Sequence, residues 1–129
     1  MIKINFDGGC QPNPGGTASI GVVIEKDGVL IKKISAVLGE GEGMSNNVAE
    51  YVAAKKALEF LIENNLNDEP IAMCGDSQLV IQQMKGAWEI KKGMYVEIAH
   101  RTKALSGHFK QLSWSWIPSE QNVLADILS

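Results

Sequence analysis

The sequence predicts an α/β fold organised around one mixed five-stranded sheet. Two observations lead to this prediction. Near the start of the chain, three segments with apolar residues at every second position are joined by short turns, which is typical of an antiparallel meander. Two further apolar strands then alternate with segments of helical periodicity. Such β–α–β crossovers pair strands in parallel and place helices on both faces of the sheet.

The strands of the meander are expected at residues 2–6, 18–25 and 29–38. In the second strand, Ile20, Val22 and Ile24 share one face. Asp27-Gly28 favours a tight hairpin before the third strand, because it supplies the positive φ angles that such a turn needs. The first strand leads into Asp7-Gly8-Gly9, so a carboxylate is expected at its end, beside glycines that let other backbone approach closely.

The rest of the chain alternates helices with strands. Ser45-Asn46-Asn47 opens a helix that ends near Asn64-Asn65 and carries an apolar stripe at helical spacing. The other elements are expected as a strand at 71–74, a helix at 78–85 interrupted by Gly86, a helix at 95–105, a strand at 111–117 and a helix at 120–129 capped by Ser119. A right-handed crossover places the strand at 71–74 parallel to the first strand, with both ends at one edge of the sheet.

Length and charge limit the classes of protein that the chain can represent. A chain of 129 residues suffices for a single domain, expected to span 1–129, and is too short for two. The net charge of −3 argues against a protein that holds nucleic acid by bulk positive charge. No membrane span or leader is apparent, so a cytoplasmic location is expected, with Cys10 and Cys74 as reduced thiols. A monomer is the default expectation.

Four acids stand at the starts or stops of predicted elements: Asp7, Glu50, Asp76 and Asp126. Each has a structural explanation, as a turn residue for Asp7, a capping box for Glu50, an N-cap for Asp76 and a solvated helix residue for Asp126. The predicted topology nevertheless brings Asp7 and Asp76 to one sheet edge, where like charges repel unless cations lie between them. An all-oxygen, water-accessible cluster suits Mg²⁺ or Mn²⁺.

Four motifs in order along the chain resemble those of type 1 ribonuclease H. They are Asp7-Gly8-Gly9-Cys10 with Asn13-Pro14-Gly15-Gly16, Ser45-Asn46-Asn47-Val48-Ala49-Glu50-Tyr51, Gly75-Asp76-Ser77-Gln78-Leu79-Val80, and Trp116-Ile117-Pro118 with Asn122 and Ala125-Asp126. The resemblance covers the whole chain. It implies a ribonuclease H-like fold and hydrolysis of the RNA strand of an RNA–DNA hybrid with two Mg²⁺ ions, for which Mn²⁺ can substitute.

The resemblance also implies a role for particular residues. Asp7, Glu50, Asp76 and Asp126 match the catalytic, metal-binding acids of the family, with Asp7 bridging both ions and Gly8 part of the metal site. The substrate-binding positions of the family match Asn13, Ser45, Asn46, Asn47 and Gln78. Short amides at such positions suit contacts to sugar hydroxyls and base edges without sequence preference.

The chain departs from the family pattern in two places, and these departures keep other functions open. Residues 86–94 are too short for the basic protrusion of many bacterial members, and only Lys85, Lys91 and Lys92 with Trp88 remain, of which Trp88 is expected to pack in the core. The loop before the last helix also lacks the histidine of many members. The alternatives are a weak or inactive module that only binds hybrids and another nuclease of the same superfamily, such as a 3′–5′ exonuclease.

Overall fold

The computed structural model describes residues 1–129, and its centre is one five-stranded sheet in the order β3-β2-β1-β4-β5. The strands are β1 (Ile2–Gln11), β2 (Thr17–Lys26), β3 (Val29–Glu40), β4 (Ile71–Gly75) and β5 (Leu112–Trp116). β1 pairs antiparallel with β2, and β2 pairs antiparallel with β3. β4 pairs parallel with both β1 and β5. The predicted mixed sheet, a meander followed by parallel strands, is therefore confirmed.

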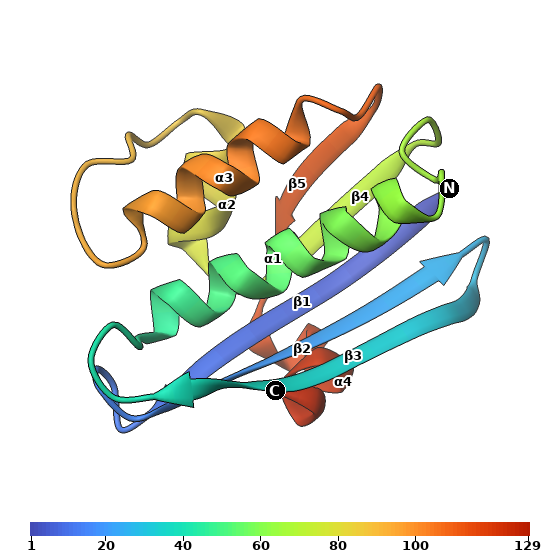
Figure 1. Ribbon diagram of the computed structural model, residues 1–129. Coiled ribbons are helices and arrows are strands. Elements are labelled where there is room, and N and C mark those ends of the chain that lie inside the picture. Colours follow the sequence, from blue (N-terminus) through green and yellow to red (C-terminus); the bar gives the residue numbers. More distant parts are fainter.

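Helices flank both faces of this sheet, as predicted. They are α1 (Asn46–Glu63), α2 (Gln78–Lys85), α3 (Val96–Ser106) and α4 (Val123–Leu128), with a 3₁₀ turn, η1 (Ser119–Gln121), before the last. Figure 1 shows α1 lying along β1, with α2 and α3 beside it. α4 packs on the opposite face, over β2 and β1, close to the backbone of Gly21. None of these helices combines the length and hydropathy that crossing a bilayer requires.

The hydrophobic core lies between the sheet and α1. Alternate side chains of the central strands supply it, and Ile4, Phe6 and Ile20 are completely buried. Phe6 meets the ring of Trp114 edge to face, with centroids 6.2 Å apart, which joins the first strand to the last. Cys10 and Cys74 are both buried free thiols, and Cys74 pairs opposite Asn5, well before Cys10 along β1.

β1 is longer than the sequence predicted, and this places the first acid differently. The strand does not end at Phe6 but continues through Asp7, Gly8 and Gly9 to Gln11, because these residues keep their pairing with β2. The parallel pairing with β4, in contrast, stops at Phe6 opposite Gly75. The backbone of Asp7 is therefore held by its pairing with β2, whereas on the side of β4 the pairing has already ended and the backbone is open.

Both helices begin where the sequence predicted, and the residues that cap them decide the capping interpretation of two of the acids. Ser45 is the N-cap of α1, and its Oγ accepts a hydrogen bond from the backbone N–H of Val48. Ser77 is the N-cap of α2 and accepts from Val80 in the same way. The capping interpretations of Glu50 and Asp76 are therefore wrong. Because serines satisfy the helix starts, both carboxylates remain available for other contacts.

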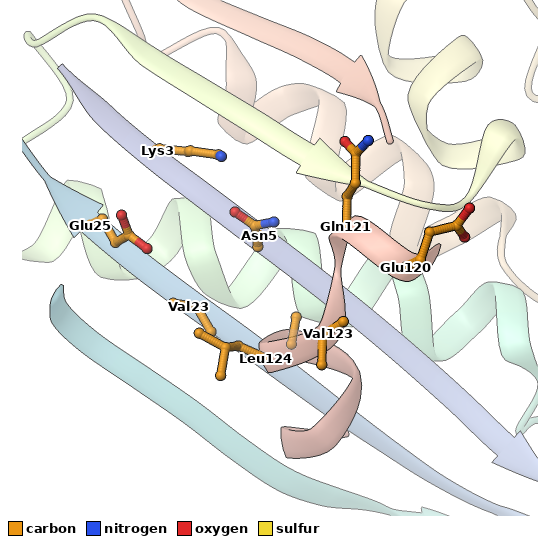
Figure 2. Close-up of a pocket in the computed structure, with 9 residues that line it drawn as sticks. Lys3, Asn5, Val23, Glu25, Glu120, Gln121, Val123 and Leu124 are labelled. Carbon is orange, nitrogen blue, oxygen red and sulfur yellow. The ribbon is translucent and has the colours of Figure 1, made fainter. Parts of the chain in front are cut away.

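The last helix is divided, whereas the sequence predicted one helix from residue 120 to 129. η1 ends at Gln121, and α4 begins at Val123 without a side-chain cap. The residue between them, Asn122, is only 1% exposed and donates a hydrogen bond from Nδ2 to the carbonyl oxygen of Phe6 at 2.9 Å. Its Oδ1 accepts from Asn5 at 3.2 Å. Figure 2 shows the region around this junction, where Asn5 on β1 lies beside the segment that carries Gln121 and Val123.

Asn122 should be a major anchor of the C-terminal segment. We expect Asn122→Ala to lower the free energy of unfolding by about 2 kcal/mol, because the buried carbonyl of Phe6 and the half-buried amide of Asn5 lose their partner. The matched control is Gln121→Ala, since Gln121 is exposed and its side chain makes no hydrogen bond within the protein. Urea unfolding of both variants measures the difference, and equal midpoints would contradict this role for Asn122.

The segment between α2 and α3 is short, as predicted, but Trp88 lies differently. Trp88 is 49% exposed, so the expectation that it packs in the core is wrong. The segment is held instead by Gln83, whose Nε2 donates to the carbonyl oxygen of Glu89 at 2.9 Å and to the hydroxyl of Tyr95 at 3.2 Å. The hydroxyl of Tyr51 donates to Gln83 Oε1 at 2.6 Å and completes this buried network.

Candidate active site

Three of the four predicted acids meet at the edge of the sheet where β1 and β4 separate. Asp7 comes from β1, Asp76 follows the last residue of β4, and Glu50 comes from the first turns of α1. Each offers one carboxylate oxygen, and these oxygens all lie within 4.8 Å of one another. Asp7 and Glu50 are buried, with 7% and 5% of their surface exposed, and Asp76 is half-buried. The predicted convergence of Asp7 and Asp76 is confirmed, and Glu50 joins them.

Gly8 makes this approach of helix and strand possible. A Cβ atom on Gly8 would lie 2.4 Å from the carbonyl carbon of Ala49 and 2.5 Å from the nitrogen of Glu50, so any side chain here would push α1 away. The N–H of Gly8 donates to Asp7 Oδ1 at 3.0 Å and also to Glu50 Oε1. The N–H of Gly8 therefore holds two of the three carboxylates. It can do so because Gly8 has no side chain to keep α1 away from β1.

Burial and mutual repulsion raise the pKa values of the three acids. Burial raises the pKa of Asp7 to about 6, and the charges of Asp126 and Asp76 add to this effect. Burial raises the pKa of Glu50 well above its ordinary value, and its hydrogen bond to Asp7 raises it further. The pKa of Asp76 is also raised, chiefly by burial and then by Asp126. These acids are thus held close together at a cost in stability.

The acids meet the requirements of a divalent cation. Carboxylate oxygens are the hard ligands that Mg²⁺ and Mn²⁺ prefer, and no histidine or cysteine belongs to the cluster. None of the ion pairs of the protein involves Asp7, Glu50 or Asp76, so no lysine or arginine neutralises the three charges. The acids are withdrawn from solvent, their pKa values are raised, and they have no basic partner. These properties are typical of a site for a bound cation and not of a structural ion pair.

Asp126 is placed near this cluster but not within it. It lies on α4, is exposed, and is not among the acids whose oxygens lie within 4.8 Å of one another. Its charge nevertheless raises the pKa of both Asp7 and Asp76. The hydroxyl of Ser129 lies 3.5 Å from Asp7 Oδ2 and 2.8 Å from the carbonyl oxygen of Asp126, so α4 reaches the same edge. A ligand role for Asp126 stays a prediction.

We expect a divalent cation to stabilise the protein, and we expect this effect to depend on pH. The folded protein binds a proton at Asp7 more tightly than the unfolded chain, because the pKa rises from 3.8 to about 6. Without a cation, this group therefore lowers the free energy of unfolding as the pH increases from about 4 to about 6, and the loss is complete above that range. Urea unfolding in chelator should show this decline, and Mg²⁺ at pH 7 should reverse part of it. Equal stability with Mg²⁺ and with chelator at pH 7 would contradict a cation site.

The predicted substrate-binding residues surround the same edge. Asn13 and Asn46 join the glycine-rich turn after β1 to the start of α1, since Asn13 Oδ1 accepts from the N–H of Asn46 at 2.9 Å. Asn46 Oδ1 accepts in turn from the N–H of Cys10 at 2.8 Å. Asn47 is exposed on the first turn of α1, and Gln78 is exposed at the start of α2. Ser45 caps α1, because its Oγ accepts from Val48, and its hydroxyl hydrogen is still free to donate.

Comparison with known proteins agrees with this arrangement of acids. Residues 5–129 match the model of the family described as "Reverse transcriptase-like". The chain belongs to this family. The match begins within β1 and continues to the end of the chain, so it includes all four predicted acids.

Solved structures relate this ribonuclease H-like domain closely to type 1 ribonuclease H. The crystal structure of LC11-RNase H1 in complex with an RNA/DNA hybrid is 35% identical, with a TM-score of 0.89 over 99% of this chain and 93% of that one. RNase H1 from the halophilic archaeon Halobacterium salinarum is 32% identical, with a TM-score of 0.87 over 98% and 92% of the two chains. The resemblance to type 1 ribonuclease H is thereby confirmed.

A longer relative carries a similar domain at its N-terminus. The bifunctional protein Rv2228c of Mycobacterium tuberculosis is 29% identical over 99% of this chain, which spans 34% of that protein, or about a third of its length. The structure of the N-terminal RNase H domain of Rv2228c superposes on this ribonuclease H-like domain with a TM-score of 0.88. The likeness to this relative therefore extends over the whole described chain, but over only part of the relative.

Two contributions to the site could not be predicted as such from the sequence. Asn122 was part of a recognised motif, but its buried bonds to β1 had no local signal, because their partners lie at the other end of the chain. Trp116 lies two residues beyond Trp114 on β5, yet it is 43% exposed, and its indole nitrogen donates to the backbone carbonyl of Asp76. Only the register of β5 against β4 reveals that contact.

Proposed function

We propose that this domain, residues 1–129, is a metal-dependent endonuclease that hydrolyses the RNA strand of RNA–DNA hybrids. The observation that carries the proposal is the cluster of Asp7, Glu50 and Asp76, whose carboxylate oxygens lie within 4.8 Å of one another without a basic partner. The relationship to type 1 ribonuclease H gives this cluster its chemistry. The family match and the likeness to LC11-RNase H1, which was crystallised with a hybrid, support the substrate.

The proposed reaction needs residues that hold charge at a fixed place. Two bound Mg²⁺ ions, which Mn²⁺ could replace, would supply Lewis-acid stabilisation of the charge that develops on the phosphodiester and would activate the attacking water. Asp7, Glu50 and Asp76 would hold these ions, with Asp126 approaching from α4. Gly8 keeps Asp7 and Glu50 in position through its N–H. Rigid strand and helix backbones thus present the carboxylates before substrate arrives.

The asparagines around the site are suited to contacts with a nucleic acid that do not depend on its base sequence. The oxygens of Asn13 and Asn46 each already accept a hydrogen bond from a backbone N–H group, and the NH₂ group of each amide is free to donate outward. Donors of this kind match phosphate oxygens, sugar hydroxyl oxygens and the acceptors of the minor groove, which every base pair presents. We infer that recognition by these residues, with Asn47 and Gln78, depends on hybrid shape and not on base sequence.

A hybrid-binding module without activity is the second candidate. The short segment between α2 and α3 favours it, because this segment presents only a small basic and aromatic patch. The patch consists of four exposed residues, Lys85, Trp88, Lys91 and Lys92. A small patch implies weak binding or help from a partner. The buried acids oppose this candidate, since a protein that only binds has no need of three clustered carboxylates that lower its stability.

The experiment that separates these functions compares substrates of one sequence. We expect the protein in Mg²⁺ to cut RNA paired with DNA, and to leave single-stranded RNA, double-stranded DNA and single-stranded DNA intact. Internal cuts should appear before terminal nucleotides are released, which distinguishes an endonuclease from a 3′–5′ exonuclease. Retention of the hybrid in a gel shift without any cutting would favour the binding module.

A further inference from the structure

Asp76 is the least constrained acid of the cluster. The last pairs of the parallel ladders are Phe6 with Gly75 and Gly75 with Trp116, so Asp76 lies one residue beyond the ordered sheet. It is also more exposed than Asp7 and Glu50. Asp76 lies between the last hydrogen bond of the sheet and the cap of α2. The carbonyl of Gly75, before it, accepts from Ile117, and the side chain of Ser77, after it, caps the helix. The Asp76 carboxylate itself is held by its own backbone, by Asp7 and by Asn122. Its direction also depends on what fixes the backbone of Asp76.

One side chain makes such a contact from the adjacent strand. The indole Nε1 of Trp116 donates a hydrogen bond to the backbone carbonyl oxygen of Asp76 at 3.1 Å. The indole nitrogen can only donate a hydrogen bond. The carbonyl of Asp76 lies between the end of β4 and the start of α2, so this bond fixes the peptide group that joins Asp76 to Ser77. Trp116 is 43% exposed, in contrast to Trp114 at 7%, so core packing does not account for its position.

We propose that Trp116 is a positioning residue, which holds the peptide of Asp76 so that its carboxylate points toward Asp7 and Glu50. The proposal rests on the cation site described above, because the carboxylate needs a fixed direction only if it binds something with the other two. Partners that orient metal ligands from behind contribute about tenfold or more to metal affinity in other proteins. The effect here should therefore be on cation affinity and on turnover, while the fold and the binding of nucleic acid remain as they are.

The test is Trp116→Phe, which keeps an aromatic ring and removes the N–H donor. Calorimetric titration with Mn²⁺ should show a dissociation constant that rises about tenfold. In hybrid cleavage at fixed Mg²⁺, kcat should fall while KM for the hybrid changes less than about twofold. The matched control is Trp88→Phe, since Trp88 is similarly exposed, at 49%, and its indole makes no hydrogen bond in the structure. This control should leave the Mn²⁺ affinity unchanged.

The outcomes separate this proposal from the proposed function. If Trp116→Phe binds Mn²⁺ as tightly as the unchanged protein, the positioning role is wrong, whatever the cleavage assay shows. If the unchanged protein cuts no hybrid but the Mn²⁺ affinity still falls in Trp116→Phe, the positioning role stands and the proposed function fails. Unfolding in chelator shows whether the variant is folded, and an equal loss of Mn²⁺ affinity in Trp88→Phe would assign the effect to surface aromatics in general and overturn the proposal.

Discussion

Asp7→Asn should reduce hybrid cleavage in Mg²⁺ at least about a thousandfold, which corresponds to about 4 kcal/mol of lost transition-state stabilisation. Asp7 is the central acid of the cluster, since the same N–H of Gly8 links it to Glu50 and the charges of Asp76 and Asp126 act on it. An asparagine has the same shape and can still accept from Gly8, but it lacks the charge that a pair of cations requires. Steady-state cleavage of an end-labelled hybrid measures the loss.

The same substitution should stabilise the protein when no divalent cation is present. Because the pKa of Asp7 is raised to about 6 in the folded state, removal of this acid should increase the free energy of unfolding at pH 7 in chelator by about 2 kcal/mol. The control is Asp68→Asn, which makes the same chemical change at an exposed residue. A variant of Asp7 that keeps a near-normal rate in Mg²⁺ would contradict the mechanism, even if its stability changed as expected.

Gly8→Ala should have a large effect on stability. Its Cβ would lie 2.4 Å from the carbonyl carbon of Ala49, which is backbone and cannot rotate away. Either α1 or β1 must shift, and we expect a loss of about 3 kcal/mol in the free energy of unfolding. Because α1 carries Glu50, cleavage should also decrease by more than about tenfold in the fraction that remains folded.

Gly9 provides the matched control for this substitution. It is the next residue of the same strand, and a Cβ there would meet no atom within 4 Å. Gly9→Ala should therefore change the free energy of unfolding by less than about 1 kcal/mol. Urea unfolding of the two variants, with thermal unfolding as a second measurement, compares them directly. Equal stabilities would mean that α1 can move away from β1 without a loss of stability. The close packing of α1 on Gly8 would then not be needed to build the site.

Most of the fold could be predicted because its signals are local or follow from general topology. The strands at Ile20 to Ile24 and the hairpin at Asp27-Gly28 come from residue alternation and turn chemistry, and both are present. The parallel placement of β4 beside β1 follows from the handedness of crossovers. The extension of β1 beyond Asp7 was missed, because glycines normally indicate a turn, whereas here pairing with β2 carries them through.

The site was only partly predictable, because its acids also resemble common structural residues. Glu50 and Asp76 had to be separated from helix caps, and the sequence offered a serine five residues before Glu50 and another directly after Asp76. Packing decides between them: Ser45 and Ser77 cap the helices, and the acids point to the cluster. The contacts of Asn122 and Trp116 depend on strands that are far away in sequence, so no local pattern could reveal them.

Strand-selective cleavage as a function of divalent cation tests the central claim most directly. A hybrid labelled at the end of each strand is incubated with the unchanged protein in Mg²⁺, in Mn²⁺ or in chelator. The acid cluster predicts internal cuts in the RNA strand with Mg²⁺ or Mn²⁺, an intact DNA strand, and no cuts in chelator. Absence of cutting with both cations in a folded sample, or equal cutting in chelator, would contradict a cation-dependent nuclease built on Asp7, Glu50 and Asp76.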